Sequence, residues 1–155
     1  MTQDYSYLAK EAFKHACAFF DCANYFMTST SRDDAFKKYY IHPVIVNIAF
    51  ACEIFLKSIM YLYAMEAKGH SLKDLIKNLP EDDKMFLDGK LTKAYNGETD
   101  MLGSRYLENI SNAFTDWRYS YEKSEISLNL GYLITLATAL KELCETRLTE
   151  RSQNG

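Results

Sequence analysis

Proline and glycine are scarce in this chain, which has two prolines and six glycines among 155 residues. Because these residues supply the turns between short strands, their scarcity argues against a β-rich fold and favours long helices. The net charge of −3 excludes an overall basic field toward nucleic acid or an acidic membrane, so any RNA contact has to be local. The hydrophobic share of 48% predicts a packed globule.

Several chemical motifs are also missing from the sequence. It contains no Glu-x-x-His, His-Glu-x-x-His or paired Cys/His cluster, so we expect no metal and no cofactor. It has neither a glycine-rich phosphate loop nor a nucleophile elbow, so ATP hydrolysis and hydrolase chemistry have no motif behind them. The four cysteines form no CxxC pair, and we interpret them as reduced core residues rather than as disulfides or metal ligands.

Two segments bear on the location of the protein. The first sixteen residues are polar and amphipathic and lack the apolar run of a signal peptide. Residues 44–65 are long enough to span a membrane, but they include Glu53 and Lys57, and each central charge costs about 2.5 to 3.5 kcal/mol in a bilayer. We therefore expect a buried helix and a cytoplasmic protein.

Apolar residues recur at three- and four-residue steps along most of the chain, the period of one helix face. The pattern predicts a helix from Tyr5 to Met27, a short helix over residues 35–40, and a long helix that Pro43 opens and Gly69 ends. The later helices are predicted at 71–79 with Ser71 as its cap, at 81–95, at 104–122, and after a cap at Ser124 or Ser127.

No alternating β pattern or internal repeat appears in the sequence. We therefore predict an all-α fold, an up-and-down bundle of four main helices with one or two short ones. Residues 1–148 are expected to form this single domain, and residues 149–155 a frayed tail.

The three histidines, His15, His42 and His70, are each expected to be solvated or to cap a helix. His42 lies at a predicted helix start, and His70 follows Gly69 in a loop that could present it. No histidine is assigned a catalytic role.

Opposite charges lie at the margins of two apolar helix faces. Glu53 and Lys57 are four residues apart, and Arg118 follows Phe114 by four and precedes Glu122 by four. Because buried charges have to be paired, we expect Glu53 to meet Arg118 in an internal clasp, with Lys57 and Glu122 completing the network. The alternatives are a ligand or RNA site built from the same charges, and solvated surface pairs.

Three segments resemble the HEPN superfamily, the higher eukaryotes and prokaryotes nucleotide-binding domain. They follow an N-x-x-x-A-x-E-x-x-x-K-type helix, a G-H-x-L-x-x-L turn and a late R-Y helix over roughly residues 40–145. The matching residues are Asn47, Ala51, Glu53, Lys57, Gly69, His70, Leu72, Leu75, Arg118 and Tyr119. The resemblance implies a cytoplasmic helical bundle that commonly dimerises, often in toxin–antitoxin, phage-defence or RNA-processing systems.

The ribonucleases of that family use an Arg-x(4-6)-His motif, and this chain departs from it. At those offsets Arg118 is followed by Lys123, Ser124 and Glu125. A lysine with a reference pKa of about 10.4 is a poor proton donor or acceptor near neutrality. We therefore expect no metal-independent RNA cleavage.

Two function classes remain open. One is a non-catalytic HEPN-like interaction module that binds a partner protein, a nucleotide or RNA through a dimer groove. The other is a ribonuclease with a displaced acid/base such as His70. In either case the candidate polar or ligand site comprises Glu53, Lys57, His70, Arg118, Tyr119 and Glu122.

A homodimer is predicted from the last helix. Beyond its main seam the helix carries Leu128, Tyr132, Leu136 and Leu143, more apolar surface than one neighbouring layer would cover. Gly131 within the helix suggests close backbone approach to another part of the structure or to a partner.

Overall fold

The computed structural model describes residues 4–29, 34–96, 100–123, 125 and 127–153, and these residues form helices and no strand. The elements are α1 (Tyr5–Thr28), α2 (Asp34–Leu62), α3 (Leu72–Lys77), α4 (Glu81–Ala94), α5 (Arg105–Ile110), α6 (Ala113–Arg118), the 3-10 turn η1 (Ser120–Glu122) and α7 (Leu130–Gln153). The all-α prediction is confirmed.

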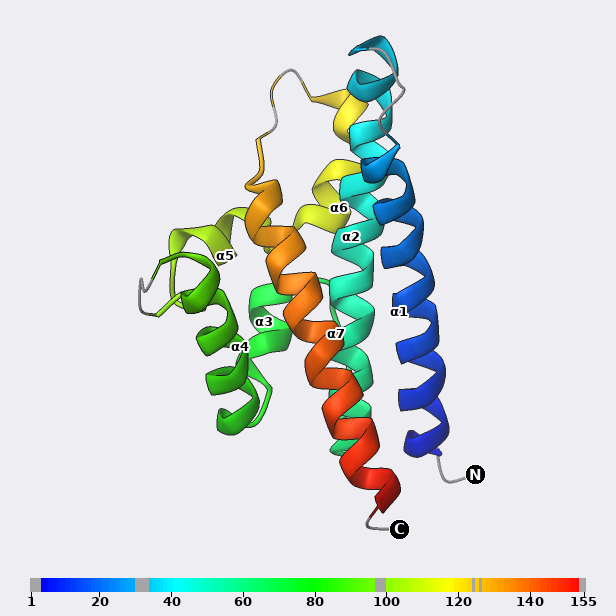
Figure 1. Cartoon of the computed structure of the whole chain (residues 1–155), viewed down its shortest axis with the longest axis vertical. Coiled ribbons are helices and arrows are strands. Elements are labelled where there is room, and N and C mark those ends of the chain that lie inside the picture. The colour runs from blue at the N-terminus through cyan, green and yellow to red at the C-terminus, as the bar shows by residue number, and fades with distance from the viewer. Residues whose placement is uncertain (1–3, 30–33, 97–99, 124, 126, 154–155) are drawn as a thin grey trace.

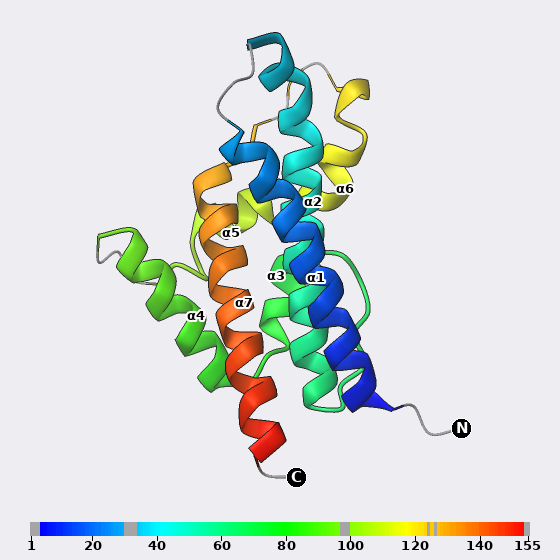
Figure 2. The same cartoon turned by 45° about the vertical axis from the view of Figure 1, so that its right-hand side comes forward.

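Four main helices run alternately up and down in chain order, α1, α2, α4 and α7 (Figure 1). Helix α2 packs between α1 and α7, and α4 packs against α7 (Figure 2). The short α3 and α6 lie against α2, which leaves α2 with neighbours on most sides. The described residues contain three short α-helices rather than one or two.

The central position of α2 explains its apolar sequence. Lys38–Leu62 is long and apolar enough to cross a membrane by length and composition, but 67% of its most apolar window is buried inside the bundle. Ile48, Phe55 and Ile59 have no exposed surface. A helix with neighbours on most sides can be apolar over most of its circumference, as α2 is.

Both ends of α2 differ from the prediction. The helix runs from Asp34 through Pro43 without a break, so Pro43 does not open it. Its C-terminus is at Leu62, where Ala64 adopts φ 54° and the Met65 N–H donates to the Met60 carbonyl at 3.0 Å. This is the Schellman arrangement, in which glycine is the usual residue, and an alanine at that position gave no stop signal in the sequence.

The helix predicted over residues 104–122 is divided at Ser111. The Ser111 carbonyl accepts a hydrogen bond from the Leu72 N–H at 2.9 Å, and its hydroxyl accepts one from the Lys73 N–H at 3.0 Å. Ser111 thus satisfies the free amides at the start of α3, alongside the Ser71 cap that the sequence predicted. This tertiary contact ends α5 and starts α6 in a new direction.

The last helix is more deeply buried than expected. Tyr132, Leu136 and Leu143 have no exposed surface within one chain, so the argument for a dimer through this face is wrong. A Cβ added at Gly131 would lie 3.6 Å from the nearest atoms, so this glycine marks no close backbone approach.

The two ends of α7 also differ from the prediction. The Asn129 side chain accepts from the Tyr132 N–H at 2.9 Å and caps the helix, in place of Ser127. Ser124, the other predicted cap, lies outside the described residues. At the other end α7 is helical as far as Gln153, so the predicted frayed tail is helical over residues 149–153.

An ion pair with a fully buried carboxylate connects two main helices. The Arg147 guanidinium on α7 contacts Asp83 on α4, with its Nε donating to Oδ1 at 2.8 Å. Asp83 is 0% exposed, and its other oxygen accepts no hydrogen bond in the structure. Burial, together with the Asp83 charge, raises the pKa of the neighbouring Tyr63 to about 12.

Candidate functional site

A cleft of about 520 Å³ lies between the first half of α2 on one side and α6 and η1 on the other. The described residues that line it include two cations and three aromatic side chains, but no carboxylate. They are Lys38, Tyr39, His42, Pro43, Val46, Asn47, Trp117, Arg118, Ser120 and Tyr121. Pockets of this size hold small ligands in proteins.

Helix periodicity brings the α2 side of the cleft together. Tyr39, His42, Pro43 and Val46 recur at three- and four-residue steps and so lie on one face of the helix. Pro43 has no N–H, so the Tyr39 carbonyl, four residues earlier, lacks its usual helical hydrogen bond. The strong packing of α2 against α1 keeps the helix continuous across this gap.

His42 joins the two sides of the cleft. Its Nδ1 lies 2.5 Å from the hydroxyl oxygen of the buried Ser120, and its ring lies 5.2 Å from the Trp117 ring. His42 was not among the predicted site residues, because the sequence predicted a helix start at this position. The three- and four-residue spacing from Tyr39 to Val46 was the signal that could have identified it.

Arg118 is exposed and forms no ion pair with any described residue. Its guanidinium carbon lies 5.0 Å from the centre of the Phe114 ring and 4.8 Å from that of Tyr119. The predicted clasp between Arg118 and Glu53 is therefore wrong. Stacking on two rings instead holds the guanidinium at the edge of the cleft.

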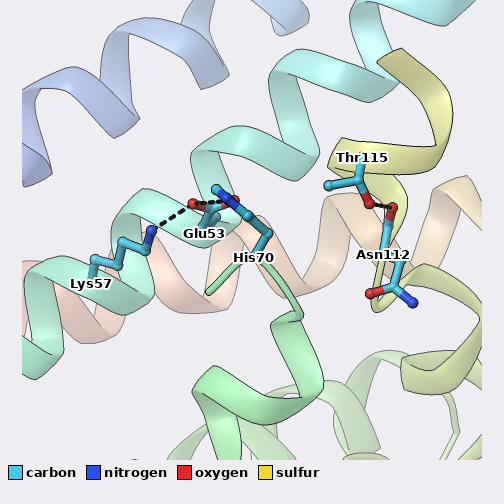
Figure 3. Close-up of polar contacts among 5 residues, drawn as sticks. All are labelled: Glu53, Lys57, His70, Asn112 and Thr115. Carbon is cyan, nitrogen blue, oxygen red and sulfur yellow. Dashed lines mark hydrogen bonds and ion pairs between the residues drawn. The ribbon is translucent and has the colours of Figure 1, made fainter. Parts of the chain in front are cut away.

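Glu53 takes its partners from its own helix and from the loop after α2. This carboxylate is 2% exposed, and it lies 2.7 Å from Lys57 Nζ and 3.0 Å from His70 Nδ1 (Figure 3). An ionised carboxylate can only accept, so Nδ1 of His70 carries the hydrogen in this contact. The Nε2 atom is then available for another partner, and the His70 side chain is 58% exposed.

Phe114 connects this cluster with the cleft. Its ring stacks on Phe50 of α2 at 4.6 Å, and the His70 ring lies 6.0 Å from it. Arg118 contacts the same ring, so His70 and Arg118 share one aromatic neighbour. At the start of α6, the Thr115 hydroxyl donates to the Asn112 carbonyl at 3.0 Å (Figure 3).

The structure thus brings five of the six predicted site residues into one region. Lys57 and His70 both contact Glu53. Phe114 links His70 to Arg118, and Arg118 in turn contacts Tyr119. Glu122 is exposed in η1, and the structure gives it no ion pair with Lys57.

The cysteines differ in their surroundings. Burial raises the pKa of the Cys52 and Cys144 thiols well above the usual range, and it also raises that of the half-buried Cys17. Cys22 is exposed, so it is not the core residue that the sequence predicted. Within the described part of the chain, no three His, Cys, Asp or Glu side chains converge as a metal site would require.

No protein-family model matches the chain, and no curated protein or solved structure matches it either. The function of the chain is therefore inferred from the residues of the cleft and of the Glu53 cluster.

Proposed function

We propose that this chain is a non-catalytic, HEPN-like interaction module that binds a nucleotide or single-stranded RNA in the cleft between α2 and α6. The observation that supports this proposal is the composition of the cleft. Its described lining combines Arg118 and Lys38 with three aromatic side chains and no carboxylate. Cations for phosphate together with rings for bases are the usual elements of a single-strand binding site.

Each kind of lining residue has a physical role in such binding. Stacking of one base on an aromatic side chain contributes about 1 to 3 kcal/mol and tolerates any base. The planar guanidinium of Arg118 can donate two parallel hydrogen bonds to a phosphate. Because Phe114 and Tyr119 already hold this group, little side-chain freedom is lost when the ligand binds.

The charge of the whole molecule is consistent with a local site. With a net charge of −3, attraction to phosphates has to come from the cleft itself. Two phosphate contacts release few counterions when a single strand binds. Each contact lowers the logarithm of the association constant by only about 0.7 for every tenfold increase in salt concentration. We therefore expect only a shallow dependence on salt.

Trp117 supplies the experiment, because it is the single tryptophan of the chain and lines the cleft. Titration with uridine monophosphate or oligouridylate should change its fluorescence in a saturable way. Arg118→Ala should weaken binding at least tenfold. Arg105→Ala is the matched control, since Arg105 stacks on Tyr106 at 5.7 Å and does not line the cleft.

Two results would refute the binding proposal. The first is the absence of any fluorescence change with every nucleotide and oligonucleotide tested. The second is an equal loss of affinity in Arg105→Ala and Arg118→Ala, which would mean that general charge and not the cleft attracts the ligand.

The wider setting of the proposal comes from the resemblance to the HEPN superfamily. On that basis we propose that the protein is a cytoplasmic homodimer that acts in a defence, toxin–antitoxin or stress system. A partner protein is a further candidate ligand. Light scattering tests the dimer, because the single chain has a mass of 17.9 kDa. The buried face of α7 is not available as its interface.

The second candidate function is a metal-independent ribonuclease, and one observation favours it. Buried Glu53 orients His70 so that Nε2 could take the proton of a ribose 2′-hydroxyl, while Arg118 on the same Phe114 ring holds the phosphate. Because the chain lacks the Arg-x(4-6)-His motif, however, we expect the purified protein not to cleave single-stranded RNA in EDTA. Cleavage that His70→Ala abolishes in a folded protein would favour the ribonuclease instead.

A further inference from the structure

We propose that the ligand is a single-stranded polynucleotide of at least two nucleotides, whose chain leaves the cleft at Arg118 and crosses Phe114 to reach His70. This inference rests on the proposed function, because it extends the same site along α2. The cleft alone could hold either a free nucleotide or a strand, and the inference chooses the strand.

One face of α2 continues from the cleft to the Glu53 cluster. His42, Val46, Phe50, Glu53 and Lys57 follow each other at three- and four-residue steps, so the cleft and the Glu53 cluster lie along the same side of this helix. Helix α6 packs on that side, with Trp117 against His42 and Phe114 against Phe50. A ligand that extends from the cleft along α6 therefore comes to His70.

His70 is held in a fixed orientation by Glu53. Both oxygens of the buried Glu53 carboxylate lie within hydrogen-bond distance of Nδ1, at 3.0 and 3.1 Å. Lys57 neutralises the same carboxylate at 2.7 Å. The Nε2 edge of a largely exposed ring is thereby presented in a fixed orientation, able to donate to a phosphate when protonated or to accept from a ribose hydroxyl when neutral.

Arg118 and His70 lie close to each other around Phe114. The guanidinium carbon of Arg118 and the ring centre of His70 lie 5.0 and 6.0 Å from the centre of the same Phe114 ring. The two groups are therefore no more than about 11 Å apart, which about three stacked nucleotides at roughly 3.4 Å each would span. A strand that continues past Arg118 can therefore place its next phosphate or ribose at His70.

The experiment compares uridine monophosphate with uridylate oligomers of increasing length, using Trp117 fluorescence and the complete chain. We expect affinity to rise at least tenfold between the monophosphate and the tetranucleotide and then to level off. His70→Ala should remove this gain and leave the affinity for the monophosphate unchanged. His15→Ala, which changes an exposed histidine on α1, is the control and should leave both affinities unchanged.

A second variant separates binding from folding. Because His70→Ala leaves Glu53 with one partner fewer, it could disturb the loop, whereas the amide of His70→Asn can still donate to Glu53 in place of Nδ1. We expect His70→Asn to lose the gain with length as well, because it has no group in the place of Nε2.

Three outcomes would overturn the inference. Equal affinity for the monophosphate and the tetranucleotide would show that the strand does not continue, although Arg118-dependent binding would keep the proposed function. Retention of the full gain in His70→Asn and His70→Ala would show that His70 does not contact the strand. Absence of binding by any of these ligands would refute both the inference and the proposed function.

Discussion

Arg147 contacts a single oxygen of Asp83 twice, through Nε at 2.8 Å and Nη2 at 2.6 Å, and so joins α7 to α4 across a carboxylate with no exposed surface. Removal of one member of such a pair leaves the other buried and unpaired, at a cost of about 3 to 5 kcal/mol. Arg147→Met should therefore lower the free energy of unfolding by about that amount, as measured by urea denaturation.

The same two helices offer a matched control. Lys90 and Glu142 also join α4 and α7, but both side chains are more than 40% exposed. Lys90→Met should cost no more than about 1 kcal/mol, because water already solvates this pair. A similar cost for the two variants would show that the burial of Asp83 does not determine the effect.

A second prediction concerns Glu53 and Arg118, which the structure separates. Lys57→Met should lower the free energy of unfolding by about 1 to 3 kcal/mol, because it leaves the buried Glu53 with His70 as its remaining partner. Arg118→Ala should change it by no more than about 0.5 kcal/mol, because this side chain is exposed. If Arg118→Ala destabilises the protein more than Lys57→Met does, the arginine has a structural role that its exposure conceals.

A third prediction concerns Pro43, which lies in the interior of α2. A proline there is about 3 kcal/mol less favourable than alanine in a helix. Pro43→Ala should therefore raise the midpoint of urea denaturation by restoring the hydrogen bond to the Tyr39 carbonyl, with a gain of up to about 3 kcal/mol.

Gly89→Ala provides the reference for that gain. Gly89 lies within α4, and a Cβ added there would meet nothing within 4 Å, so this change should add up to about 1 kcal/mol through helix propensity alone. A Pro43→Ala variant that is no more stable than the wild type would indicate that the proline ring contributes packing that offsets its missing N–H.

A fourth prediction concerns the reactivity of the cysteines. The thiolate is the reactive form, and burial raises the pKa of Cys52 and Cys144, so these thiols remain protonated at pH 8. Iodoacetamide should modify the exposed Cys22 first and Cys17 more slowly, with Cys52 and Cys144 modified only in denaturant. Peptide mass spectrometry measures the order, and early modification of Cys52 in the native protein would contradict the core described above.

Helix periodicity and cap residues were sufficient to predict α1, α3 and α4 within about two residues at most boundaries. These helices have strong local signals, such as the Ser71 cap of α3 and the acidic start of α4 after Pro80. The same periodicity predicted the all-α class, because apolar positions at three- and four-residue steps need no knowledge of their neighbours. For the site, the sequence selected Glu53, Lys57 and Arg118 as charges at apolar margins and His70 as a histidine in a loop. It predicted Arg118 as the partner of Glu53, whereas the structure pairs Glu53 with Lys57 and His70.

Only the tertiary structure decided those partners. Ser111 satisfies amides at the start of α3, which divides the helix predicted over residues 104–122 and turns Arg118 outward onto Phe114 and Tyr119. The early end of α2 at Leu62, followed by the positive φ of Ala64, frees the loop that brings His70 to Glu53. The first event depends on hydrogen bonds between segments distant in the chain, and the second on an uncommon backbone conformation of an ordinary residue. Neither leaves a periodic signal in the amino-acid sequence.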